Sequence, residues 1–152
     1  VLIIQIPLGM YLVDMDFSEK RLTIENIHVA VGISIFYLTI LRLIYKTFNP
    51  TPNLNNSIFP GQKIIAKLNH VFLYISILVI TISGALKKLY NGEELNMFFF
   101  NLEIQDNFDL AEIFYEIHIL SNYTLIALIS LHISAVIIHK ILFKENLLKK
   151  IL

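Results

Sequence analysis

Apolar residues fall into four runs along the chain, separated by polar connections. The runs cover about 1–13, 27–45, 64–86 and 113–143. A helix needs roughly 20 apolar residues to cross a bilayer core about 30 Å thick, and the last three runs are long enough. The first is too short and lacks the basic flank of a signal peptide. We expect it to be the end of a helix that starts before this sequence, which predicts an all-α, integral membrane four-helix up-and-down bundle, with its first helix incomplete, as a single domain over 1–152.

The composition agrees with a membrane protein. Hydrophobic residues make up 56% and charged residues 16%, and the mean hydropathy is +0.68. That balance is too apolar for an ordinary soluble domain. The absence of cysteine excludes disulfides, thiolate-bound iron–sulfur clusters and cysteine nucleophiles. The net charge of zero gives no reason to expect a nucleic-acid partner.

The charges predict the orientation. The connections 14–25 and 87–116 carry four basic and eleven acidic residues, whereas the loop 46–67, Arg42 and the tail carry eight basic residues and one acidic residue. Because cytoplasmic segments are rich in Lys and Arg, the second side, with the tail, should be cytoplasmic. We also expect the aromatic stretch 98–100 in the acidic connection to lie at the membrane interface.

The fourth run carries three of the five histidines, at His118, His132 and His139. A histidine inside a membrane span is costly to leave without a partner, so it marks a candidate functional site. His118 and His132 are 14 positions apart, which places them within about 40° of one helix face and roughly 21 Å apart along the axis. One face of the last helix should therefore present an imidazole near each side of the membrane.

His28 opens the second run at the same depth as His118. Two imidazoles at matched depth on facing helices can ligate one haem iron from both sides, and Gly32 would leave room for the porphyrin. The alternative is a pair of interfacial histidines bonded to water or backbone. His132 lies deeper, where none of the remaining histidines is an obvious partner. It predicts a second haem whose other ligand precedes this sequence, or else a core histidine bonded to a neighbouring Ser or Asn.

Three further residues are candidates for cofactor binding near the cytoplasmic side. His70 and His139 are better placed to bond a propionate or a quinone head group than to ligate iron, although each can be an ordinary interfacial histidine. Arg42 should be buried late in the second helix, on the side of His28. It can pair with the propionates of an inner haem, or it can extend its charged head to the membrane surface.

Several segments resemble the bacterial cytochrome b561 family: 26–34 (NIHVAVGIS), 41–43 (LRL), 49–52 (NPTP), 66–74 (AKLNHVFLY), 116–118 (EIH) and 131–135 (LHISA). The likeness covers almost the whole chain and is loose between 90 and 110. It implies a four-helix bundle holding two b-type haems, each with two histidine ligands. His28 and His118 would then hold the outer haem, and His132 the inner one. It also suggests that His70 and His139 lie near a quinone site or the propionates.

The function expected from these features is electron transfer across a bacterial inner membrane, between ubiquinone or another quinone and a reactant at the outer face. The resemblance permits superoxide as that reactant, and equally a role as the cytochrome subunit of a dehydrogenase or hydrogenase, with a redox partner protein. A homodimer is also compatible with it. The competing class is a non-haem protein, a proton-linked transporter or assembly factor, that uses its histidines as proton relays.

Overall fold

The computed structural model describes residues 1–49 and 61–143. Within these ranges the helices are α1 (Leu2–Val13), α2 (Glu19–Phe48), α3 (Gln62–Tyr90) and α4 (Phe108–Phe143), and two short strands, β1 (Leu95–Asn96) and β2 (Asn101–Leu102), lie between α3 and α4. The predicted all-α membrane fold is confirmed. In the described part of the chain, α2, α3 and α4 are each long and apolar enough to cross a membrane, and α1 is a shorter apolar helix.

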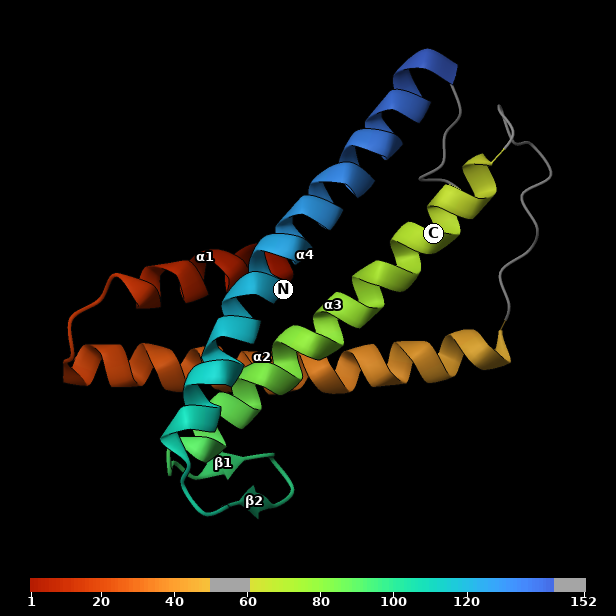
Figure 1. Ribbon diagram of the computed structural model, residues 1–152. Helices are drawn as coiled ribbons and strands as arrows, with labels where there is room; N and C mark the ends of the chain where they lie inside the picture. Colours follow the sequence, from red (N-terminus) through yellow and green to blue (C-terminus); the bar gives the residue numbers. More distant parts are fainter. Residues whose placement is uncertain (50–60, 144–152) are drawn as a thin grey trace.

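The helices form two antiparallel pairs (Figure 1). Helix α1 turns back along α2, while α3 and α4 lie side by side and share the largest helix–helix contact. Helix α2 crosses the second pair obliquely and packs mainly against α3. Many large apolar side chains face outward, such as Ile3, Leu41 and Leu131, and a bilayer would cover them.

Capping and backbone conformation make α2 and α3 begin earlier than the apolar runs predicted. The Ser18 side chain caps α2 by accepting a hydrogen bond from the backbone N–H of Arg21 at 3.2 Å. Gly61 precedes α3 with φ of +88°, a conformation that favours glycine. Helix α2 therefore starts well before the apolar run at 27, and α3 continues to Tyr90, four residues past the predicted end at 86.

A small hairpin, absent from the sequence-based prediction, joins α3 to α4. Its strands are antiparallel, with Leu95 opposite Leu102. Leu95 is 1% exposed and packs with Ile33 of α2 and Leu89 of α3. The Tyr37 hydroxyl donates a hydrogen bond to the backbone oxygen of Met97 at 3.2 Å. The hairpin thus ties α2 to the C-terminal end of α3, and we call this end of the molecule the hairpin end.

Candidate functional site

His28 of α2 and His118 of α4 come together near the hairpin end. Their ring centroids are 6.2 Å apart and the ring planes make an angle of 76°. A histidine nitrogen lies about 2.0 Å from a bound metal, and the ring centroid lies about 1.1 Å further away. Two imidazoles on opposite sides of one iron therefore have centroids about 6 Å apart. The observed separation matches that arrangement.

The two rings line a cavity of about 500 Å³ bounded by residues of all four helices. This volume is in the range of cofactor pockets, roughly 300–1,000 Å³. Helix α1 contributes Gln5 and Gly9, α2 contributes Gly32, and α3 contributes Gly84. The cavity is therefore built where the two helix pairs cross.

Two glycines make room for the imidazoles. A Cβ atom on Gly9 would lie 2.9 Å from Cε1 of His28, and one on Gly84 would lie 2.9 Å from both Cε1 and Nδ1 of His118. Such separations are shorter than van der Waals contact between these atoms. Each histidine thus packs edge-on against a helix that lacks a side chain at that position. Gly9 could not be assigned this role from the sequence, since the contact joins two helices.

His118 is oriented by a backbone carbonyl of α3. Its Nδ1 lies 2.8 Å from the carbonyl oxygen of Ile80, which accepts the hydrogen bond. The Ser83 hydroxyl donates to the same oxygen at 3.2 Å. With the hydrogen on Nδ1, the Nε2 lone pair of His118 is free for a metal. Metal-binding histidines commonly have a second hydrogen bond of this kind.

Two buried polar atoms at or beside His28 have no hydrogen-bond partner among the residues that the structure describes. They are Nδ1 of His28 itself and Oε1 of Gln5, whose amide nitrogen donates to the backbone oxygen of His28 at 2.8 Å. Sequence reasoning missed Gln5, which is 8% exposed. The facing imidazoles, the glycine contacts and these unpaired atoms in one cavity fit a haem held by two histidines.

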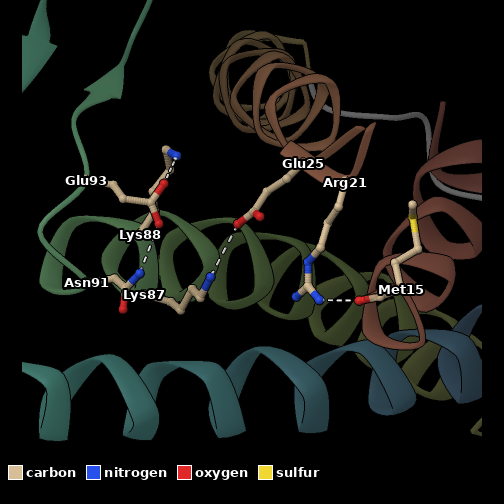
Figure 2. Close-up of polar contacts among 7 residues, drawn as sticks. All are labelled: Met15, Arg21, Glu25, Lys87, Lys88, Asn91 and Glu93. Atoms are coloured by element: carbon tan, nitrogen blue, oxygen red, sulfur yellow. Dashed lines mark hydrogen bonds and ion pairs between the residues drawn. The ribbon is translucent and has the colours of Figure 1, made fainter. Parts of the chain in front are cut away.

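Basic residues line the same cavity toward the hairpin end (Figure 2). Lys87 pairs with Glu25 at 3.4 Å, Lys88 pairs with Glu93, and the Arg21 guanidinium donates to the backbone oxygen of Met15. Because these cations sit beside a cavity, they can also bind the carboxylates of a cofactor or an anionic reactant.

The ion pair also affects Glu93. Partial burial acts to raise the pKa of its carboxyl, but the hydrogen bonds from Lys88 and Asn91, with the nearby charge of Lys87, outweigh burial, and the pKa falls below its ordinary value of 4.5. Glu93 is therefore ionised at neutral pH and holds Lys88 at the base of the hairpin.

Comparison with known proteins identifies the family. The model of the family described as "Prokaryotic cytochrome b561" matches residues 1–152. The chain belongs to the prokaryotic cytochrome b561 family. It is also 22% identical over 149 residues to a protein named "Cytochrome b561 homolog 2" from Escherichia coli strain K12, covering 95% of this chain and 79% of that protein. The chain is thus a membrane haem protein of a family that transfers electrons across membranes.

In this cytochrome b561 family member, the opposite ends of α3 and α4 bring a second set of candidates together. The rings of His70 and His132 have centroids 5.2 Å apart, and Nδ2 of Asn69 lies 3.2 Å from Nδ1 of His132. The sequence indicated no obvious histidine partner for His132, and the structure brings His70 beside it. His70 lies about two turns after the start of α3 at Gln62.

Arg42 and His139 are the two predicted residues that remain. Arg42 is exposed rather than buried on α2, since its helix diverges from α4 beyond the crossing. Nearby, the Lys46 ammonium lies 5.1 Å from the centroid of the Tyr74 ring. The side chain of His139 lies outside the described residues.

Proposed function

We propose that His28 and His118 are the axial ligands of a b-type haem at the hairpin end, and that the protein carries electrons through it. The observation that supports this most directly is the 6.2 Å separation of the two rings within a cavity bounded by glycines. Bound in this way, haem supplies one-electron cycling between ferric and ferrous iron, with both axial positions filled.

The protein residues would hold and orient this group. The Ile80 carbonyl fixes the His118 ring through Nδ1, while Gly9 and Gly84 admit the imidazoles. Lys87 and Arg21 lie where they can neutralise propionate carboxylates, each exchanging a present acceptor for a propionate. The apolar side chains of the cavity would help to keep bulk water away from a bound haem and so to set its potential.

A second haem would lie at the other end of α4. His132 would supply one ligand, as the resemblance suggests. His70 would then bond a propionate or a quinone head group. His118 and His132 are separated by about 21 Å along the axis of α4, so the haems would form a two-step path across the membrane.

The cationic lining at the hairpin end favours an anionic reactant there. Arg21, Lys87 and Lys88 line the cavity together with the acidic residues Asp14 and Glu25. Cations outnumber anions there, and a net positive lining raises the local concentration of anions. Superoxide is such an anion, and each molecule oxidised to dioxygen releases one electron. Two such electrons, with two protons, reduce one quinone to quinol. The second candidate is a cytochrome subunit of a dehydrogenase or hydrogenase, because an electron-donating protein could deliver electrons to a haem in the same cavity.

A difference spectrum of membranes containing the full-length protein tests the haem assignment. Reduced minus oxidised, we expect the sharp α-band of b-type haem, and we expect His118→Ala to lose about half of the haem because it removes a ligand of one of two sites. Thr124→Ala is the matched control, since this hydroxyl on α4 is exposed and bonds only to its own helix at Leu120. A flat spectrum would favour a proton relay, and full haem content in His118→Ala would contradict the assignment of His28 and His118 as ligands.

A further inference from the structure

We propose that Gln5 is the positioning residue for His28, with its Oε1 accepting a hydrogen bond from the His28 Nδ1–H. The proposal rests on the haem assignment made above. Helix α1 would then orient His28 through the Gln5 side chain, just as α3 orients His118 through the Ile80 carbonyl. Each axial imidazole would then be oriented by a helix other than its own.

The two atoms have complementary hydrogen-bonding roles. A neutral imidazole that binds iron through Nε2 carries its hydrogen on Nδ1 and must donate it. His28 Nδ1 and Gln5 Oε1 are both buried, both lack a partner, and both residues line the same cavity. A buried donor and a buried acceptor left apart are each unfavourable, so forming the hydrogen bond between them removes two penalties at once.

Gln5 is already attached to the right turn of α2. Its amide nitrogen donates to the backbone oxygen of His28 at 2.8 Å. A Cβ on Gly32, one turn further along, would lie 3.7 Å from that nitrogen, so the amide lies close against the 28–32 turn. With the nitrogen held by the carbonyl of His28, the oxygen of the same amide is also kept close to this turn of α2.

The arrangement on the opposite side of the site follows the same design. There, His118 reaches the carbonyl of Ile80 beside Gly84, the residue four positions on. Here, Gln5 reaches the carbonyl of His28 beside Gly32, again four positions on. In both places a glycine leaves a helix carbonyl open to a polar side chain from another helix. The side chain that uses the open carbonyl of His28 is Gln5.

The redox behaviour of the haem should report this hydrogen bond. An acceptor at Nδ1 makes the imidazole a stronger donor to iron and favours the ferric state. Gln5→Leu removes the acceptor, so we expect the ferrous state to be favoured about tenfold, which is 59 mV upward for a one-electron couple. Gln5→Glu keeps an oxygen acceptor, so its potential should stay at or below that of the unsubstituted protein.

The measurement is a redox titration of the full-length, haem-loaded protein, with electron paramagnetic resonance of the ferric form. The signal of the relevant haem is the one that disappears in His118→Ala. Thr39→Val is the control, because Thr39 is a buried hydroxyl bonded within α2 to Ile35 and lies outside the cavity. It should leave both readings unchanged.

The outcomes separate the two proposals. A raised potential and altered resonance in Gln5→Leu, with Gln5→Glu unchanged or lower, supports the hydrogen bond. Unchanged readings in Gln5→Leu, or equal shifts in Gln5→Leu and Gln5→Glu, overturn the role of Gln5 and leave the haem assignment standing. Absence of a low-spin haem signal in the unsubstituted protein overturns both.

Discussion

At the scale of single residues, the site depends on glycines, which have no side chain, as much as on the histidines. Gly84 allows the His118 ring to lie against α3, where a methyl group would be 2.9 Å from two ring atoms. Gly84→Ala should displace the ring and break its hydrogen bond to Ile80. We expect haem affinity at this site to fall about tenfold or more, the usual effect of losing a second-shell partner, as measured by the haem-to-protein ratio after purification.

Ser83→Ala is the matched control for Gly84→Ala. Ser83 is adjacent, is 2% exposed and donates to the same Ile80 oxygen at 3.2 Å. Its removal adds no volume and leaves the oxygen to the imidazole, so haem content should be retained. Equal haem loss in both variants would show that α3 tolerates no change here, and that the cavity does not depend on close approach of the ring.

Asn69 should orient His132 through its side-chain amide, as the Ile80 carbonyl orients His118. Its amide lies 3.2 Å from Nδ1 of His132, and an amide can present either its oxygen or its nitrogen to a ring. Asn69→Leu removes this partner. We expect the potential of the haem that depends on His132 to change while the haem lost in His118→Ala is unaffected. A titration that resolves the two haems checks this, and a shift confined to the hairpin-end haem would contradict it.

At the scale of elements, hydropathy alone predicted the number and order of the helices. It did not predict their ends, because Ser18 and Gly61 set the beginnings of α2 and α3 by capping and backbone conformation rather than by polarity. The hairpin was missed because its strands are only two residues each, and its stability comes from Leu95 and Tyr37 contacts distant in sequence.

The base of the hairpin should weaken in acid. The pKa of Glu93 is lowered in the folded protein, so its contribution to stability is present above the ordinary value and is lost as the pH falls through the folded value. The carboxylate is partly exposed, so the effect should be below about 1 kcal/mol. Thermal unfolding of the protein in detergent, at pH values from neutral to below 4.5, should show this loss.

Glu93→Gln provides the comparison for the acid effect. It removes the titrating group while keeping an oxygen that can accept from Lys88 and Asn91. The variant should be less stable than the unsubstituted protein at neutral pH, and the difference should disappear in acid. A difference that grows as the pH falls would have the wrong sign and would exclude the pair as the source of the acid sensitivity.

At the scale of the whole molecule, sequence spacing predicted that His28 and His118 share a depth, and the structure brings them together. Periodicity gives depth and face for each helix. It gives no lateral position, which is set by how α2 crosses α3 and α4 (Figure 1). For that reason Gln5 and Gly9, whose roles arise only from that crossing, could not be found in the sequence, whereas the histidines could.

The crossing of the helices also determines which charged segments lie at the same end of the molecule. Lys87 and Glu25 come from different helices and pair at the hairpin end, so the acidic connections 14–25 and 87–116 lie on one side of the membrane. The basic residues Arg42 and Lys46 lie near the far end of α2, where the Lys46 ammonium faces the ring of Tyr74 in α3. Because basic segments remain in the cytoplasm, the hairpin end should face outward. Reporter fusions after Asn49 should be active in the cytoplasm, and fusions after Asn91 should be active outside.

Reversing the charge bias tests whether that bias determines the orientation. Lys46→Glu combined with Arg42→Gln removes two of the eight basic residues on the predicted cytoplasmic side and should lower the fraction of molecules inserted with the fusion after Asn49 inside. Lys20→Gln on the opposite side, where four basic residues are outnumbered by eleven acidic ones, should have no such effect. If the Asn91 fusion is instead cytoplasmic in the unsubstituted protein, the cation-lined cavity faces inward, and superoxide outside the cell could not be its reactant.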